Sequence, residues 1–291
     1  MYMGSTFHLT HWRQHVALDV GTAGIRVATG MSAVAECLSR IGGRLAMRGG
    51  VVADADALSR ILRPMLDKAR VFGIVRPCVL TCAPSDVNRH ERKMLVDAVR
   101  DAGAASVTVI PEPLAAAIGA GLDVSAAFAQ MVVDIGEGVT DCAVIASSKI
   151  KATDAVRIGC GRMRWAIDDA FAAGNARLEG WDSADYLCRC GICDNNVQQG
   201  SSIAASALRP VIEEITGMID AFVKGLPPEV GCEIIESGIC LTGGGALVPG
   251  IREAIEQRTG ISVFTPKTPR VSVVEGARSI LPVVMYLNQW K

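Results

Sequence analysis

The chain has 291 residues, half of them hydrophobic, which is enough for two ordinary domains with a substantial core. Its net charge is -1 and its basic residues are scattered, so no nucleic-acid partner is expected. No apolar run reaches the roughly 18 residues that span a bilayer. Ten cysteines in a long chain without a signal peptide fit a reducing cytosol. We therefore expect a cytoplasmic protein, soluble or peripheral to a membrane.

The N-terminal segment, residues 1–16, places apolar side chains such as Phe7, Leu9 and Trp12 among polar ones. A segment of this composition can lie on a membrane surface, or it can be a disordered leader. Membrane association is thus one of two expectations for this segment.

The first predicted element is a β-hairpin with strands at 16–20 and 25–28. Its turn consists of small residues: Gly21, Thr22, Ala23 and Gly24. Glycine permits positive φ and removes the Cβ that would keep a ligand away, so successive backbone N–H groups can face a phosphate. Asp19 stands two residues before the first glycine, where a carboxylate can hold a hydrated Mg²⁺.

Residues 31–50 contain many small side chains, and no helix or strand is predicted there. Helical periods and short apolar strands then alternate: helix 56–69, strand 78–81, helix 94–102, strand 107–110 and helix 114–120. This alternation predicts an α/β fold with a largely buried sheet. Glu112 lies at the last strand-to-helix junction, where ligands gather in α/β sheets. It can orient or deprotonate a water there, or it can cap the helix dipole.

A second hairpin, MVVDIGEGVTDCAVIA at 131–146, repeats the design of the first. Its strands, 132–135 and 142–145, enclose a glycine-rich tip and carry acids at both shoulders, Asp134 and Asp141. Asp134 precedes Gly136 as Asp19 precedes Gly21. Two such hairpins facing each other would grip a polyphosphate, with Asp19 and Asp134 converging on one cation. For this stretch alone, an ordinary hairpin with a D/G-rich turn is the alternative.

The C-terminal part continues with a strand and glycine turn at 156–161, helix 162–173, an irregular cysteine-rich stretch at 181–200, helix 203–223, strand 238–241 and helix 251–258. The turn before the last helix contains Gly243, Gly244 and Gly245, against which a flat purine or ribose can lie. Cys188, Cys190 and Cys193 lack a matching fourth ligand, so we expect loop thiols or small hydrophobes there instead of zinc.

With these loops and Glu112 in place, the chain resembles the actin and sugar-kinase superfamily, and most closely the bacterial actin MreB family. The matching stretches stand in the family's order: LDVGTAGIRVA, GGVVAD, VIPEPLAAAIGAGLDV, MVVDIGEGVTDCAVI, VRIGCGRMRWAI and LTGGGALVPGIREAIEQRTGISV. The resemblance implies two actin-like, ribonuclease H-like domains around an ATP–Mg²⁺ cleft, formed by 1–128 plus 266–291 and by 129–265. The segments that hold the outer subdomains are short here, so both look truncated.

The resemblance also implies roles for single residues. Glu112 and Thr140 would position the attacking water, and Asp19 and Asp134 would hold the magnesium shell. The phosphates of ATP or ADP would face Gly21, Thr22, Ala23, Gly24, Gly136, Gly138 and Val139. The nucleoside would face Gly243, Gly244, Gly245, Ala246 and Leu247. Cys188 and Cys190 stand where the family has lysine and glutamate beside the adenine.

Glu137 departs from the family because it replaces the middle glycine of the second phosphate turn. A carboxylate about 4 Å from a phosphate would be repelled by about 4 kcal/mol at an effective dielectric constant near 20. We therefore expect Glu137 to point outward at the turn.

Proteins of this family commonly polymerise into double protofilaments, with ATP hydrolysis timing disassembly. The resemblance thus predicts a self-associating, ATP-dependent filament protein with slow ATPase activity. One alternative is a non-polymerising chaperone-like or reactivase-type ATPase resembling EutJ of ethanolamine utilisation, and another is an inactive nucleotide-binding adaptor. The shortened lobes, which make longitudinal filament contacts in the family, favour these alternatives. A peripheral membrane or protein partner is a further expectation.

Overall fold

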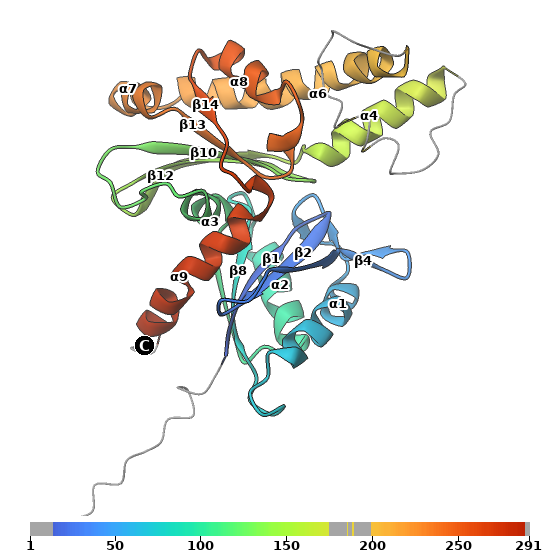
Figure 1. Ribbon diagram of the computed structural model, residues 1–291, viewed down its shortest axis with the longest axis vertical. Helices are drawn as coiled ribbons and strands as arrows, with labels where there is room; N and C mark the ends of the chain where they lie inside the picture. The colour runs from blue at the N-terminus through green and yellow to red at the C-terminus, as the bar shows by residue number, and fades with distance from the viewer. Residues whose placement is uncertain (1–13, 175–184, 186–187, 189–198, 289–291) are drawn as a thin grey trace, which may run out of the picture.

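The computed structural model describes residues 14–174, 185, 188 and 199–288 (Figure 1). Its N-terminal half is built on a five-stranded mixed sheet in the order β3-β2-β1-β8-β9. The strands are β1 (His15–Val20), β2 (Gly24–Thr29), β3 (Ala35–Leu38), β8 (Cys78–Ala83) and β9 (Ser106–Pro111). β1 pairs antiparallel with β2 as the predicted hairpin and parallel with β8, so the hairpin turn and the ends of the parallel strands meet at one edge.

A second five-stranded sheet, in the order β12-β11-β10-β13-β14, repeats this plan. It comprises β10 (Gln130–Ile135), β11 (Thr140–Ala146), β12 (Lys149–Val156), β13 (Ile239–Thr242) and β14 (Val263–Phe264). The β10–β11 hairpin is again followed by a parallel neighbour, β13. The predicted α/β class is confirmed. The division of the chain into two domains at 128 and 265 stays a prediction.

Helices cover the sheets in three layers. α1 (Ala55–Lys68) and α2 (Arg89–Asp101) pack on the outer face of the first sheet. α4 (Cys160–Ala173), α6 (Gln199–Lys224), α7 (Pro228–Ser237) and α8 (Ile251–Thr259) cover the outer face of the second sheet, seen at the top of Figure 1. α3 (Glu112–Gly119) and α9 (Ser272–Asn288) share one core with the inner faces of both sheets.

The alternation of side chains along β1 explains how one strand contributes residues to two hydrophobic cores. Val16 and Leu18 belong to the core under α1 and α2, whereas Ala17 belongs to the core beneath α3 and α9. Successive residues of a strand point to opposite faces. Asp19, on the same face as Ala17, is therefore only 4% exposed and lies on the inner side of the sheet.

α3 and α9 cross at two glycines. A Cβ on Gly119 would lie 1.8 Å from the carbonyl oxygen of Ser272, and one on Gly276 would lie 1.8 Å from that of Ala115. No side chain fits at such a contact, so the two backbones touch. The crossing fixes the beginning of α9 against the helix that Glu112 begins.

Several elements differ from the sequence-based expectation. The segment 31–50, for which no element was expected, and the two residues after it contain β3 and two small hairpins made of β4 (Arg40–Ile41), β5 (Arg44–Leu45), β6 (Met47–Arg48) and β7 (Val51–Val52). The strand expected at 156–161 ends at 156, and only the glycine turn follows it. A helix that was not expected, α7, begins at Pro228, where the missing N–H of proline costs nothing.

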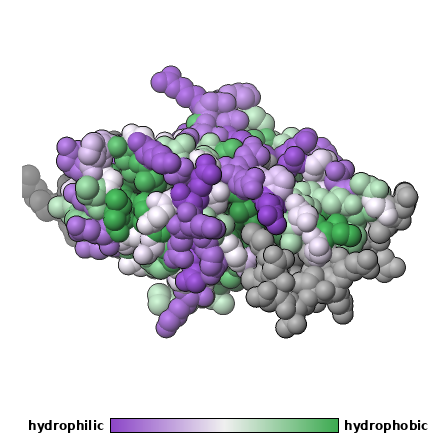
Figure 2. Space-filling model, turned by 90° about the horizontal axis from the view of Figure 1, so that it is seen from above, coloured by the Kyte–Doolittle hydropathy of each residue, from purple (hydrophilic) through white to green (hydrophobic). Residues whose placement is uncertain are grey.

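The outer helices are amphipathic, as their periodicity predicts. Figure 2 looks onto the layer of α6, α7 and α8, where hydrophilic residues cross the middle of the face and hydrophobic ones form separate patches. In the part of the chain that the structure describes, no helix combines the length and apolarity needed to cross a membrane.

Candidate functional site

The tips of the two hairpins touch. A Cβ on Gly138, in the β10–β11 turn, would lie 2.7 Å from Thr22 Oγ1 in the β1–β2 turn and 2.8 Å from the Cα of Gly49. The Gly50 amide donates a hydrogen bond to Thr22 Oγ1 at 2.9 Å. Gly49 and Gly50 both have positive φ, which lets this connection pass between the tips.

A cavity of about 320 Å³ opens beside the contact. Its lining includes most of the predicted site residues: Asp19, Gly21, Thr22, Ala23, Gly24, Glu112, Asp134, Gly136, Gly138, Val139, Gly243, Gly244 and Leu247. Residues that are far apart in the sequence, from both hairpins, the start of α3 and the loop after β13, thus surround one cavity.

Three predicted residues are not on the lining. Thr140 is completely buried and its hydroxyl donates to the carbonyl oxygen of Ile158 at 2.9 Å. Gly245 packs on Ile135, where a Cβ would lie 2.2 Å from Cγ2. Ala246 lines a separate groove at the start of α8.

Backbone donors at the two tips are available to a ligand. Within the described residues, no acceptor pairs with the amides of the following five residues: Thr22, Ala23, Glu137, Gly138 and Val139. The turns themselves are held by other bonds, such as Gly21 N to Gly24 O at 3.1 Å and Gly136 N to Val139 O at 2.8 Å. Successive free N–H groups in a turn form a nest that binds anions such as phosphate.

Carboxylates gather on the inner side of the cavity. Burial raises the pKa of Asp134 to about 6, although Thr242 Oγ1 donates to its Oδ1 at 2.6 Å. Burial also raises the pKa of Glu112 well above its ordinary value, and the charges of Asp134 and Asp19 raise it further. The pKa of Asp19 is raised by burial and partly lowered by Arg26. Because these acids disfavour each other's ionisation, positive charge among them is stabilising.

Asp141 forms a second buried acid site that connects the two halves of the molecule. Its carboxylate accepts hydrogen bonds from Ser85 N at 2.7 Å and Ser85 Oγ at 2.6 Å. Burial nevertheless raises the pKa of Asp141 to about 7. The sequence shows Asp141 at the shoulder of the hairpin but does not show which residue it meets, because Ser85 follows β8 in the first sheet.

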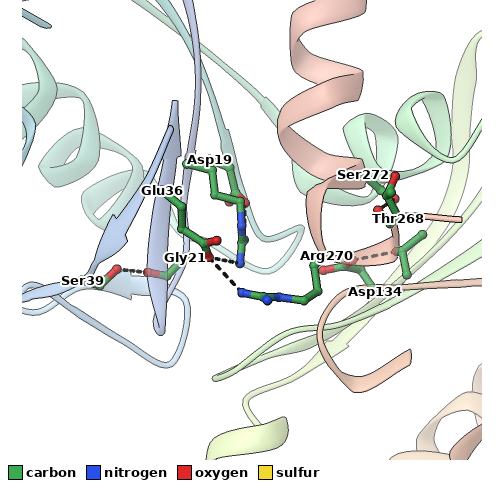
Figure 3. Close-up of polar contacts among 10 residues, drawn as sticks. Asp19, Gly21, Glu36, Ser39, Asp134, Thr268, Arg270 and Ser272 are labelled. Carbon is green, nitrogen blue, oxygen red and sulfur yellow. Dashed lines mark hydrogen bonds and ion pairs between the residues drawn. The ribbon is translucent and has the colours of Figure 1, made fainter. Parts of the chain in front are cut away.

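A chain of ion pairs that includes three lining residues of the cavity was not predicted from the sequence. Arg26 donates to Asp19 and to Glu36, each at 2.9 Å, and Arg270 donates to the same Glu36 oxygen at 3.0 Å. Figure 3 shows Arg270 extending from the C-terminal segment toward Glu36 on the first sheet. The register of the first hairpin was the available signal, since it pairs Arg26 with Asp19.

Glu137 does not point outward, so that expectation is wrong. Its carboxylate lies at the first turn of α4 and forms an ion pair with Arg164, which also contacts Asp185 at 3.0 Å. The Glu137 side chain is 12% exposed and that of Arg164 is 7% exposed. The guanidinium compensates the charge that would repel phosphates, and the N-terminus of α4 favours an acid there.

The cysteines near the site are partly described. Cys160 and Cys188 are buried and line the cavity, while Cys190 and Cys193 lie outside the described residues. The described residues contain no group of three His, Cys, Asp or Glu side chains that could hold a metal ion directly.

The site residues fit a hydrated magnesium ion. Carboxylate oxygens are the ligands that Mg²⁺ prefers, and Mg²⁺ usually keeps several of its waters. Asp134 and Glu112 form no ion pair among the described residues, so their carboxylate oxygens are open to such an ion. Asp19, the other predicted ligand, is already paired with Arg26.

Two mixed sheets, each turning a hairpin into a shared cavity, define an actin-like fold. The solved structure of MreB5 of Spiroplasma citri bound to ADP superposes with a TM-score of 0.85 at 20% identity, over 95% of this chain and 98% of that one. The MreB/Mbl protein family model matches residues 39–171 and 191–289. The cell shape-determining protein MreB of Escherichia coli K12 is 31% identical over 276 residues, which covers 86% of this chain and 80% of that protein. The chain belongs to the MreB/Mbl family.

Two further structures share the fold with lower TM-scores. The MamK double helical filament has a TM-score of 0.76 at 14% identity, over 92% of this chain and 98% of that one. The ethanolamine utilization protein EutJ from Carboxydothermus hydrogenoformans has a TM-score of 0.66 at 21% identity, over 91% of this chain and 88% of that one.

Proposed function

We propose that the cavity binds the phosphates of ATP and ADP between the two hairpin tips. The observation that carries this proposal is the meeting of two glycine turns, with backbone N–H groups free to donate to an anion, beside buried carboxylates. Gly243, Gly244 and Leu247 would contact the nucleoside. A bound Mg²⁺ would supply positive charge between the phosphates and Asp134.

For hydrolysis, Glu112 is the residue that would orient the attacking water. It lines the cavity at the first residue of α3 and forms no ion pair among the described residues. Water attacks the γ-phosphorus, the bond to the bridging oxygen of ADP breaks, and the water proton leaves toward a nearby carboxylate or phosphate oxygen. Thr140, the other predicted catalytic residue, is given no role in this proposal, because it is completely buried and is not among the lining residues of the cavity.

The test of this role is single-turnover ATP hydrolysis by the wild type and by Glu112→Gln. We expect turnover to fall at least about 100-fold, since positioning and proton transfer by one group typically contribute that much, while ATP affinity changes little. Equal and negligible rates in both proteins would support the inactive adaptor and remove Glu112 from catalysis.

At the level of the whole protein, we propose a cytoplasmic, ATP-dependent filament subunit with a role in cell shape. The proposal is supported by membership of the MreB/Mbl family, by the similarity to the cell shape-determining protein MreB of E. coli, and by the filament formed by the structurally similar MamK. High-speed pelleting with ATP and with ADP, followed by negative-stain microscopy, is the test. Filaments that form with ATP and decline with ADP are expected.

A non-polymerising ATPase is the second candidate. It is favoured by the short segment between β2 and α1, where only β3 and four two-residue strands stand. Fewer outer residues leave less surface for a contact that must repeat in one direction, and such a contact propagates only if both its faces are present. ATP hydrolysis without pelleting at any protein concentration would select this candidate.

A peripheral membrane contact is a further part of the proposal. Phe72 and Ile74 are each 79% exposed between α1 and β8, at the tip of a small hairpin closed by Val71 and Val75. Arg70 and Arg76 flank this tip. Exposed apolar side chains between two cations suit the surface of an anionic bilayer.

A further inference from the structure

Arg26 occupies the same place in the first hairpin that Asp141 occupies in the second. The β-sheet register pairs Asp19 with Arg26 and Asp134 with Asp141. Side chains that oppose each other across two antiparallel strands lie on the same face. The first hairpin therefore places an acid beside a base, and both line the cavity, whereas the second places two acids side by side, of which only Asp134 lines it.

Not all N–H groups of the Arg26 guanidinium have a hydrogen-bond acceptor among the described residues. It lines the cavity beside Gly21 and Gly24, and its side chain is 14% exposed. Two of its five N–H groups are accounted for by Asp19 and Glu36, each at 2.9 Å. Its buried Nε has no hydrogen-bond partner among the described residues.

The acids beside Arg26 are already compensated. Asp19, Arg26, Glu36 and Arg270 form a chain of two acids and two bases, in which both arginines share one Glu36 oxygen. A phosphate that enters the first turn can replace Glu36 as acceptor, because a guanidinium binds two phosphate oxygens side by side and phosphate carries the greater charge.

We propose that Arg26 is a phosphate-binding residue that supplies, from the protein itself, the positive charge expected from a cation at Asp19. The proposal rests on nucleotide binding in this cavity. Its consequence is that ADP retains much of its affinity when divalent cations are removed. Glu36 competes with the phosphates for Arg26 and so weakens binding.

The alternative is that Arg26 only clamps Asp19 to Glu36 and never contacts the ligand. The two roles differ in their dependence on phosphate. A phosphate-binding arginine acts on ADP and leaves adenosine unaffected, whereas a clamp that shapes the cavity affects both ligands alike.

Calorimetric titrations of the full chain with adenosine and with ADP, in Mg²⁺ and in excess EDTA, make this distinction. For the wild type we expect the Kd for ADP to rise less than about tenfold in EDTA. In Arg26→Met we expect ADP binding in EDTA to weaken at least about thirtyfold, which corresponds to about 2 kcal/mol, with the Kd for adenosine unchanged. Arg26→Lys should recover part of the loss, and Glu36→Gln should tighten ADP binding.

Two results would overturn the inference and leave nucleotide binding intact. One is a loss of more than about 100-fold when the wild type is moved from Mg²⁺ to EDTA. The other is an equal weakening of adenosine and ADP in Arg26→Met. The first measurement needs no variant, so it stands even if Arg26→Met does not fold. A wild type that binds neither ligand in Mg²⁺ would instead refute the proposed nucleotide site itself, and this inference with it.

Discussion

At the scale of single residues, burial determines the pKa values of the acids at the second hairpin. Asp134 and Asp141 face each other across the β10–β11 hairpin, and the pKa values of both are raised by burial, to about 6 and about 7. Removing water from like charges disfavours their ionised forms. A cation or a proton beside these carboxylates is therefore stabilising.

The first prediction concerns pH. Because the pKa of Asp141 is about 7 in the folded protein and 3.8 for an unperturbed aspartate side chain, the folded state binds the proton more tightly. This contribution to stability is complete below pH 3.8 and is lost as the pH rises toward 7. The slope is at most about 1.4 kcal/mol per pH unit for one proton.

Asp141→Asn should flatten this dependence. Its amide can accept from Ser85 N and donate to Ser85 Oγ, so the contact survives without the charge. Denaturant unfolding of nucleotide-free protein at several pH values measures the slope, with the exposed Asp169→Asn on α4 as a control. A slope that is identical in the wild type and in Asp141→Asn would contradict this account.

The second prediction concerns the ion pair of Glu137. Replacing Arg164 by methionine leaves the carboxylates of Glu137 and Asp185 without this guanidinium beside the second phosphate turn. We expect ATP affinity to fall about tenfold or more, since uncompensated charge near the phosphates is repulsive. The double variant Glu137→Gln with Arg164→Met should recover part of that loss. Unchanged affinity in the single variant would show that Glu137 does not sense the ligand.

At the scale of elements, the two hairpins and most helices follow from periodicity and glycine placement. The β4–β7 hairpins could not be predicted, because strands of two residues carry no periodic pattern. The cavity lining was largely predictable because glycine turns mark it. Side-chain partners such as Ser85 for Asp141 and Arg164 for Glu137 could not be predicted, because they depend on how separate elements pack.

The third prediction tests the crossing of α3 and α9. Gly276→Ala places a methyl group where the carbonyl oxygen of Ala115 stands, so the helices must separate. We expect a loss of stability of about 1–3 kcal/mol or more, typical of overpacking. Gly217→Ala on α6 is the control, because a Cβ there meets nothing within 4 Å, and it should stabilise by about 0.5–1 kcal/mol. Thermal unfolding of both variants decides the matter, and similar shifts of Tm would contradict the packing account.

At the scale of the whole molecule, two halves with the same plan meet through contacts that cross the cleft. Ser85 reaches Asp141, Arg157 reaches Asp86 at 2.6 Å, and Thr22 touches Gly138. These contacts hold the tips together before any ligand arrives. The sequence predicts that the tips approach each other, but the residues that fasten them come from loops without a recognisable motif.

The fourth prediction concerns the exposed hairpin tip. Phe72→Ser with Ile74→Ser should reduce binding to phosphatidylglycerol vesicles about tenfold or more, because two apolar side chains no longer leave water. Co-sedimentation with vesicles measures this, with Met31→Ser as a control that alters an exposed apolar residue elsewhere. Equal binding by the double variant and the wild type would remove this tip as a membrane contact.

The most direct test is a crystal structure of the protein with a non-hydrolysable ATP analogue and Mg²⁺. We predict that the β- and γ-phosphates lie between the two hairpin tips, within hydrogen-bond distance of the amides of Thr22, Ala23, Gly138 and Val139. Phosphates bound elsewhere on the protein, or a cavity left empty at saturating analogue, would contradict the proposed function.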